Sequence, residues 1–511
     1  MKPIQAWALL GAVLCVAFGL RVWGMGYDLP HIYHPDEPSY VSISQHIFKT
    51  GELNPGFFHF SSLLFYLNAL AYIPFYLGGS VLGVFQSTAD ILPPVAVAMG
   101  VVQAPTPAAV LLGRAVSILF GVATVFMASV VGKRISGRAA VGLLAALVVA
   151  IEPTSVWHSR LITPDTLVTF FVLCTLWASV RIFERGRAWD YVLAGLFVGL
   201  SASSKYNGAL AMLPVVAAHF LYVRRPMQGF QWLVLAGVSS LVGFVVTTPY
   251  SILDYPAFLR DLNFEIHHYS TGHPGMEGAP FRWYVLNMWS TGGLLFPMAF
   301  LGMLLGFVRQ RRATLLLSAF PVLYFVFICN FAVRNDRTFL PMIPYLAILA
   351  AWFAVQCWDH VRQMRPAGYL AFAKPAFVLV LAFAMLAIPL SKSIADGREL
   401  GKPDSRELAR GWIAKSLPAA SKVAFESYAP FMDGSQLSLQ PVSRLIDHDA
   451  DWYAANGFQY LVFSQGMFGR FYADPPRYPD EIAQYEALFD RFERIAEFPD
   501  DKYTIRVYRV R

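Results

Sequence analysis

The stretch His34-Pro35-Asp36-Glu37-Pro38 places two adjacent carboxylates just past the first hydrophobic run of the chain, at about residues 4–22. Of the 511 residues, 56% are hydrophobic and only 14% are charged, whereas a soluble domain carries about 25% charged residues. The composition therefore predicts an α-helical polytopic membrane protein. In a chain with so few charges, an acidic pair beyond the end of a membrane helix indicates a function. Catalysis at the boundary between water and lipid explains the pair best.

The hydrophobic runs predict the spans. A hydrocarbon core of about 30 Å needs about 20 apolar residues per helix. Eleven candidate spans lie near residues 4–22, 108–132, 140–157, 166–183, 189–204, 207–223, 230–248, 283–308, 313–332, 339–358 and 374–391. The first has no small-residue cleavage site, so we interpret it as a retained anchor.

The loop charges predict the orientation. Basic clusters follow every second span, at Lys133-Arg134 with Arg138, Arg181 with Arg185 and Arg187, Arg224-Arg225, Arg309 with Arg311-Arg312, and Arg362 with Arg365. The positive-inside rule assigns these loops and the N-terminus to the cytoplasm. The alternate loops then face outward, as does the tail.

Residues 61–104 leave the count open. They contain one apolar stretch, Leu63 to Phe85, and a weaker one, Ile91 to Val102. If only one of the two crossed the membrane, every later loop would be inverted. The segment is therefore expected to cross either not at all or twice, which gives 11 or 13 spans.

The C-terminal part has a different composition. Of 40 basic and 33 acidic residues, 34 fall in residues 392–511. We expect a membrane domain over 1–391, with a first outward loop at 23–107, and an extracytoplasmic α/β domain over 392–511. In this tail the patterns predict a helix at 405–416 and strands at 422–426, 460–464 and 503–510.

Unusual polar residues gather in the loops expected to face outward. The candidate catalytic residues are Asp36, Glu37 and Asp165, and the candidate substrate- or phosphate-binding residues are Lys205, Arg337, Arg334, Arg160, His268 and Tyr269. Carboxylates suit the removal of a proton from an acceptor hydroxyl, whereas Lys and Arg suit a phosphate that becomes the leaving group. Taken singly, Asp36 and Asp165 could instead be helix caps, and Lys205 and Arg337 could be anchors at the membrane interface.

Several motifs carry a resemblance. They are His34-Pro-Asp-Glu37, Gly113-Arg-Ala-Val-Ser117, Gly132-Lys-Arg-Ile-Ser-Gly-Arg138, Ser159-Arg-Leu-Ile-Thr-Pro-Asp165, Gly199-Leu-Ser-Ala-Ser-Ser-Lys-Tyr-Asn-Gly208 and Arg337-Thr-Phe-Leu-Pro-Met-Ile-Pro344. In order and spacing the chain resembles the GT-C superfamily of membrane glycosyltransferases, and within it the protein O-mannosyltransferase and lipid A aminoarabinose transferase group. The likeness covers most of residues 1–350.

The resemblance implies an inverting transfer of a sugar from a polyprenyl phosphate to a lipid, glycan or protein acceptor at the outer face of a bacterial plasma membrane. It makes Asp36 the base, Glu37 its support and Asp165 the second acid, with Lys205 and Arg337 on the phosphate and Arg334 as a helper. It implies interface helices in the first outward loop, which favours 11 spans, and no metal or other cofactor. The sugar and the acceptor stay open, because the loop Glu265–His273 does not match the mannosyltransferases.

One alternative reading is a transporter or flippase of a lipid-linked sugar. A second is a membrane scaffold whose outer domain binds a partner, but it leaves the outward acidic and basic residues unexplained. Transporters show repeated halves and helices broken near the midplane, and the sequence suggests neither. Basic residues lie between hydrophobic runs, as expected for membrane loops, so nucleic acid is not an expected partner.

Overall fold

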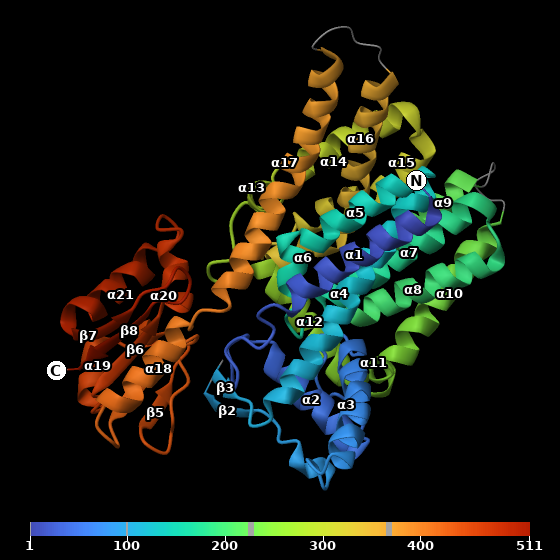
Figure 1. Cartoon of the computed structure of the whole chain (residues 1–511). Coiled ribbons are helices and arrows are strands. Elements are labelled where there is room, and N and C mark those ends of the chain that lie inside the picture. The colour runs from blue at the N-terminus through green and yellow to red at the C-terminus, as the bar shows by residue number, and fades with distance from the viewer. Residues whose placement is uncertain (1, 99–100, 223–228, 364–369, 511) are drawn as a thin grey trace.

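The computed structural model describes residues 2–98, 101–222, 229–363 and 370–510. A bundle of apolar helices is joined through one long helix to a smaller tail that contains a sheet (Figure 1). The basic residues Arg224, Arg225 and Arg365 lie outside the described residues.

All eleven predicted spans are largely helical. In chain order they are α1 (Pro3–Val22), α4 (Pro107–Ser136), α5 (Ala139–Ile151) with α6 (Pro153–His158), α7 (Asp165–Arg185), α8 (Ala188–Ser204), η2 (Tyr206–Ala211) with α9 (Met212–Tyr222), α10 (Phe230–Thr247), α13 (Pro280–Gly292) with α14 (Leu295–Arg309), α15 (Arg311–Ile328), η3 (Asp336–Met342) with α16 (Ile343–Gln363), and α17 (Leu370–Glu399). Helices α4 and α7 begin, and α15 ends, at one end of the bundle. We call this end of the bundle the site end.

Fewer of these helices have full membrane length than the sequence predicts. By length and composition, eight described helices could cross a membrane, or nine if the bent pair α13–α14 is one span. Seven of the eight belong to the predicted spans, and the eighth is Leu63–Val81 in the first outward loop. Pro153 interrupts the predicted span 140–157 because it cannot donate a backbone hydrogen bond within a helix. The span after Lys205 starts as a 3₁₀ turn, which shortens its α-helical part.

One predicted span is sharply broken. Helices α13 and α14 meet at an angle of 107°, where Gly293 adopts a φ of +53° that favours glycine. The expectation of a continuous helix over 283–308, and of no broken helix, is therefore wrong. None of the residues at this break lines the large cavity described below.

The first outward loop forms its own layer at the site end. It contains β1 (His31–Ile32), α2 (Glu37–Thr50), α3 (Leu63–Val81), η1 (Thr88–Asp90), β2 (Val95–Ala98) and β3 (Val101–Gln103). The strands pair antiparallel in the order β1-β3-β2. A second crossing by Ile91 to Val102 is wrong, because the described residues there are mainly strands.

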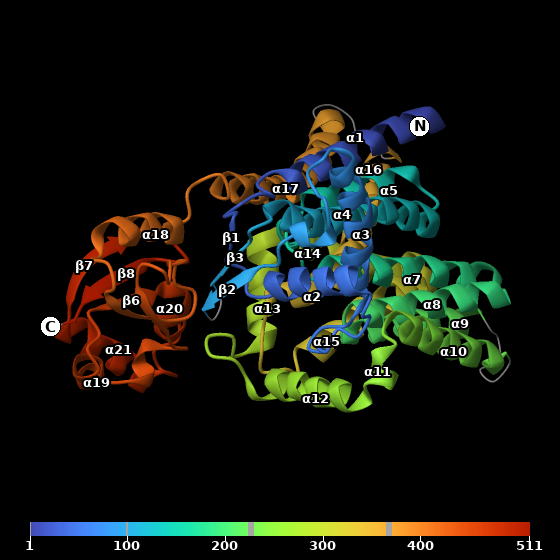
Figure 2. The same ribbon diagram turned by 90° about the horizontal axis from the view of Figure 1, so that it is seen from below.

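Helix α3 packs beside α2 and across the beginning of α4 (Figures 1 and 2). Near its start, Leu64 shares a buried cluster with Val110 of α4. Further along, the Tyr72 hydroxyl donates to the Ala109 carbonyl oxygen at 3.3 Å. Helix α3 is also long and apolar enough to cross a membrane, so its position as an interface helix stays a prediction.

The tail is an α/β unit, as the sequence predicts. It contains α18 (Ser405–Ser416), β4 (Lys422–Phe425), β5 (Ser438–Pro441), η4 (Leu445–Asp447), α19 (Ala450–Ala455), β6 (Tyr460–Ser464), α20 (Gln465–Tyr472), α21 (Pro479–Arg491), β7 (Glu493–Phe498) and β8 (Ile505–Arg509). The sheet order is β5-β4-β6-β8-β7, with β4 parallel to β5 and β6 and the other pairs antiparallel. Helix α17 runs past residue 391 to Glu399, so the turn into the tail lies at about 400–404.

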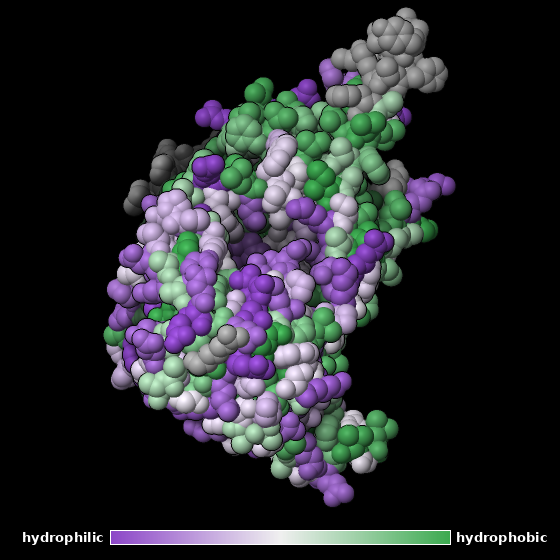
Figure 3. Space-filling model, turned by 90° about the vertical axis from the view of Figure 1, so that its left-hand side faces the viewer, coloured by the Kyte–Doolittle hydropathy of each residue, from purple (hydrophilic) through white to green (hydrophobic). Residues whose placement is uncertain are grey.

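The tail surface is largely hydrophilic, whereas hydrophobic side chains cover the helices behind it (Figure 3). On this face Figure 3 also shows a hollow bordered by hydrophilic side chains. This distribution fits a tail in water and a bundle in lipid.

Candidate active site

Asp36 lies at the start of α2 and faces a cation from a distant part of the chain. Its Oδ2 accepts a hydrogen bond from Arg337 Nη1 at 2.5 Å, and the two side chains are 17% and 20% exposed. Burial alone would raise the pKa of Asp36, but the Arg337 charge and His34 outweigh it and hold the pKa below its ordinary value. Asp36 is therefore a carboxylate at neutral pH.

Asp165 forms a second pair of the same kind. It is the first residue of α7, and Lys205 Nζ donates to its Oδ1 at 2.7 Å. Its other oxygen, Oδ2, is buried and has no protein partner among the described residues. Neither Asp36 nor Asp165 makes a helix-capping hydrogen bond through its carboxylate. The capping alternative therefore finds no support.

Glycines bring Lys205 to this position. Gly199 of α8 lies against α10 so closely that a Cβ would meet the Ser240 carbonyl oxygen at 2.3 Å. After Lys205 the chain folds back, and a Cβ on Gly208 would meet the Ser201 carbonyl oxygen at 2.4 Å. Small residues let membrane helices approach closely, which explains the glycines of the 199–208 motif.

Glu37 has a different environment from its neighbour Asp36. It is fully buried and forms a two-pronged pair with Arg114 of α4, with N–O distances of 2.7 and 2.9 Å. Glu37 Oε1 also accepts the Ile162 N–H at 3.0 Å. Glu37 therefore ties α2 both to α4 and to the loop that leads into Asp165. The sequence analysis identified Gly113-Arg114 as part of a motif but did not predict that Arg114 pairs with Glu37.

A cavity of about 300 Å³ lies beside the two pairs. Asp165, Lys205, Arg337 and Tyr269 line it, so four of the nine predicted site residues share one surface. Much of the remaining wall is apolar and aromatic, formed by Phe60, Leu262, Ile266, Phe327, Ile328 and Phe331. We call this space the large cavity; it combines cations at one point with an apolar wall, which suits an amphiphilic phosphate.

Three predicted binding residues do not line the large cavity. Arg160 is buried and donates to the Leu20 carbonyl oxygen at 2.7 Å. Arg334 lies over the Trp283 ring at 5.8 Å, and His268 stacks on Phe264. A direct contact of these side chains with a phosphate at Lys205 and Arg337 has no support from this geometry.

The large cavity is also lined by residues that the sequence analysis did not identify as site residues. His59 Nδ1 lies 3.0 Å from Glu265 Oε1 of α12 (Tyr255–Thr271), and both residues line the cavity. The Tyr206 hydroxyl donates to the Phe58 carbonyl oxygen at 2.8 Å. These residues come from three separated segments, and only the unusual charge of Glu265 in an outward loop signalled them in the sequence.

A second, more polar cavity of about 200 Å³ is lined by residues of both the tail and the first outward loop. His34 and Pro35 line it from the loop, whereas Arg406 and Tyr503 line it from the tail. We call it the junction cavity. Asp36 lies between the two cavities, because its preceding residues line one and its partner Arg337 lines the other.

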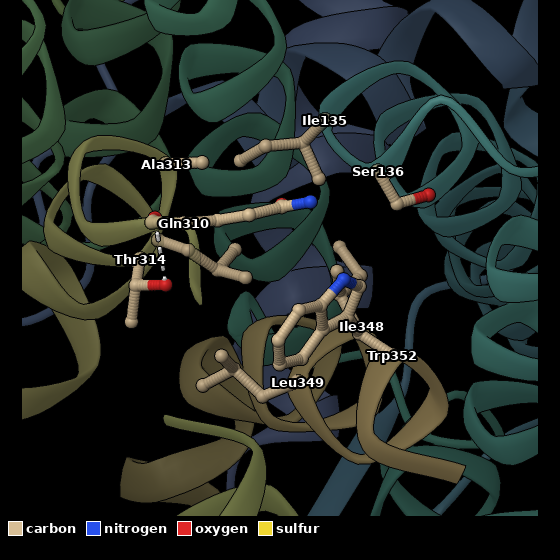
Figure 4. Close-up of a pocket in the computed structure, with 9 residues that line it drawn as sticks. Ile135, Ser136, Gln310, Ala313, Thr314, Ile348, Leu349 and Trp352 are labelled. Carbon is tan, nitrogen blue, oxygen red and sulfur yellow. Dashed lines mark hydrogen bonds between the residues drawn. The ribbon is translucent and has the colours of Figure 1, made fainter. Parts of the chain in front are cut away.

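A third space lies at the opposite end of the helices and differs from both. It measures about 20 Å³ and is lined by nine residues, including Ser136, Gln310, Thr314 and Trp352 (Figure 4). It has no charged side chain, and its size is close to that of one water molecule. It offers no chemistry comparable to that of the site end.

No group of three or more His, Cys, Asp or Glu side chains that could hold a metal ion occurs within 2–98, 101–222, 229–363 and 370–510. The expected independence from metals stays a prediction.

Comparisons with known proteins agree with this architecture. Residues 109–250 match the family model described as dolichyl-phosphate-mannose-protein mannosyltransferase. An uncharacterized protein of Aquifex aeolicus is 22% identical over 240 residues. That match spans 46% of this chain and 47% of the relative, so it reaches about half the length of each.

Two solved structures share the fold. The apo oligosaccharyltransferase of Archaeoglobus fulgidus superimposes with a TM-score of 0.59 at 14% identity, over 92% of this chain and 71% of that one. ArnT of Cupriavidus metallidurans, bound to undecaprenyl phosphate, gives 0.57 at 16% identity, over 99% and 98%. The chain is thus a membrane protein with the fold of the GT-C glycosyltransferase superfamily, as the resemblance predicted.

Proposed function

We propose that this protein is an inverting glycosyltransferase that moves a sugar from a polyprenyl phosphate to an acceptor hydroxyl. The observation that carries the proposal is the convergence of Asp36–Arg337 and Asp165–Lys205 beside a cavity with an apolar wall. The GT-C fold and the match to a mannosyltransferase family model support it.

The proposed reaction uses each group at a stated atom. The Asp36 carboxylate takes the proton of the acceptor hydroxyl, whose oxygen bonds to the anomeric carbon on the face opposite the phosphate. The bond between that carbon and the phosphate oxygen breaks, and its electron pair leaves with the phosphate. Arg337 and Lys205 stabilise this developing charge. Glu37 supports the site by holding α2 and the loop before Asp165.

The two cavities suit two substrates. The large cavity takes the donor, with its phosphate at Lys205 and Arg337 and the first part of its prenyl chain along the apolar wall. The junction cavity gives the acceptor access to Asp36 from the other side. No metal takes part in this scheme.

The proposed location is a bacterial plasma membrane with the site end outside. At the opposite end Arg138 pairs with Asp359, and Arg134 pairs with Glu184. Basic residues at that end favour a cytoplasmic position under the positive-inside rule.

Comparing the cell envelope with and without the gene tests the function. Mass spectrometry of lipids, polysaccharides and secreted proteins is expected to show a hexose or pentose missing from one class, restored by the wild-type gene and not by Asp36→Asn. Unchanged glycoconjugates would contradict the proposal. Purified protein that moves a lipid-linked sugar across a liposome bilayer without transferring it would favour a flippase.

A further inference from the structure

The tail contacts the strand that leads into Asp36. Glu407 of α18 accepts a hydrogen bond from the Tyr33 hydroxyl at 2.6 Å. The same oxygen, Oε1, lies 2.7 Å from His31 Nδ1. His31 and Tyr33 are each only 4% exposed. A carboxylate of the tail thus meets two buried side chains that end three residues before Asp36.

Stacked rings surround this contact. The Arg406 guanidinium lies between the rings of Tyr33, at 4.1 Å, and Tyr503, at 3.8 Å. The His31 ring stacks on Phe431 at 4.6 Å. Cation–π contacts gain strength when they are desolvated, and Arg406 is only 4% exposed.

Arg406 also carries charge pairs on both sides of the junction. It forms a two-pronged pair with Asp404 of the tail, at 2.6 and 2.8 Å, and lies 3.7 Å from Asp28 of the loop. Burial would raise the pKa of Glu407, but its contacts with His31, Tyr33 and Arg410 lower it to about 2. The Glu407 contact is therefore charged throughout the neutral range.

The membrane domain holds the same loop from its other side. Strand β1 pairs with β3, with His31 opposite Gln103, and the Ala104 N–H donates to the Pro30 carbonyl oxygen at 2.7 Å. Asp36 lies three residues after Tyr33, and its backbone N–H donates to His34 Nδ1 at 3.2 Å. The link from the Tyr33 anchor to the Asp36 backbone is thus short and itself hydrogen-bonded.

We propose that the tail positions the catalytic loop, with Glu407 and Arg406 as positioning residues that fix residues 28–34 and thereby the direction of Asp36. Neither residue touches the reacting atoms. This inference rests on the proposed function for the role of Asp36, whereas the anchoring of the loop stands on the contacts alone. Arg406 is buried against this strand and is paired with an acid on each side of the junction, Asp404 and Asp28.

Hydrogen–deuterium exchange of the full-length protein in nanodiscs tests the anchoring. In Glu407→Gln the amides of residues 28–34 are expected to exchange about tenfold faster, because a charge-assisted hydrogen bond is lost. Exchange in strands β4 and β6 should not change, which shows that the tail stays folded. Equal exchange of residues 28–34 in wild type and Glu407→Gln would overturn the proposal.

Two matched variants separate this contact from general effects. Arg410→Gln removes the partner of the other Glu407 oxygen, Oε2, at 2.8 Å, and should leave residues 28–34 protected. Glu497→Gln removes a carboxylate that pairs with two arginines of the tail, Arg494 and Arg506. It should also leave the exchange of residues 28–34 unchanged. Faster loop exchange in Glu497→Gln would show that any lost tail charge loosens the loop, and would overturn a specific role for Glu407.

Turnover then tests the positioning role. Glu407→Gln is expected to lower kcat about tenfold while the affinity for undecaprenyl phosphate, the probe for the donor site, stays unchanged, because Lys205 and Arg337 are untouched. A loosened loop with normal kcat would overturn the positioning role. If Asp36→Asn also turned over normally, the proposed function would fail, whereas the exchange result on the anchor would stand.

Discussion

Asp36 and Glu37 are neighbours in the chain but belong to two different kinds of ion pair. Glu37 and Arg114 are both fully buried and bonded through both carboxylate oxygens. Asp36 and Arg337 keep about a fifth of their side chains exposed and share one short contact beside a cavity. The first pair has no room for a substrate, whereas the second can exchange its partners for one. The comparison indicates that the carboxylate open to a substrate, and not every acidic residue of the motif, carries out the chemistry.

The largest expected effect separates the two pairs by stability. Glu37→Gln should lower the free energy of unfolding by about 3–5 kcal/mol, because Arg114 is left as a buried charge without its partner. Asp36→Asn should change it by less than about 1 kcal/mol. Unfolding in mixed micelles measures both values.

The double variant Glu37→Gln/Arg114→Gln controls this prediction. It should be more stable than the sum of the two single variants implies, since neither charge is then buried alone. Additive losses would show that the two residues do not act as a pair.

The next effect concerns the donor. Lys205→Ala and Arg337→Ala should each weaken binding of undecaprenyl phosphate about 10- to 100-fold, because each removes a charge-assisted hydrogen bond to phosphate. Arg138→Gln, at the opposite end of the bundle, should bind it normally. Unchanged affinity in both cavity variants would make Lys205 and Arg337 interface anchors.

Much of this arrangement follows from the sequence. The loop charges and motifs predicted that Asp36, Asp165, Lys205 and Arg337 share one face. In the structure Asp165, Lys205 and Arg337 line one cavity, and Asp36 pairs with Arg337 beside it. Motif order carries this information because Asp165, Lys205 and Arg337 each lie at the end of a predictable hydrophobic span, and Asp36 lies in the loop after the first span. Their catalytic and binding roles remain predictions.

Other features depend on packing that the sequence pattern does not encode. Arg160 occurs in a matching motif, yet its side chain turns to the Leu20 carbonyl. The pairing of Glu37 with Arg114 joins residues 77 positions apart. The 107° bend at Gly293 lies inside the predicted span 283–308. Hydrophobicity predicts burial, but it does not determine side-chain partners or bends.

A smaller expected effect is a shift in pH dependence. Asp36 must be ionised to accept a proton, so activity rises as pH passes upward through its pKa, which Arg337 lowers. In Arg337→Gln this pKa should rise, and the acidic limb of kcat/KM should move to higher pH. Arg334→Gln, which removes a nearby arginine without contact to Asp36, should leave the limb in place. An unmoved limb in Arg337→Gln would show that another group controls it.

The smallest expected effect lies at the far end of the bundle. Gln310→Ala, in the uncharged space of Figure 4, should keep turnover and donor affinity within about twofold of wild type. A large loss in either would mean that the two ends of the bundle are coupled.

The most direct test of the central claim is the turnover of purified Asp36→Asn with a polyprenyl-phosphate sugar and the acceptor found in the envelope comparison. Because Asn cannot accept the proton, transfer should fall at least about 100- to 10,000-fold, while undecaprenyl phosphate still binds and the protein stays folded. Transfer at nearly the wild-type rate would contradict the assignment of Asp36 as the base.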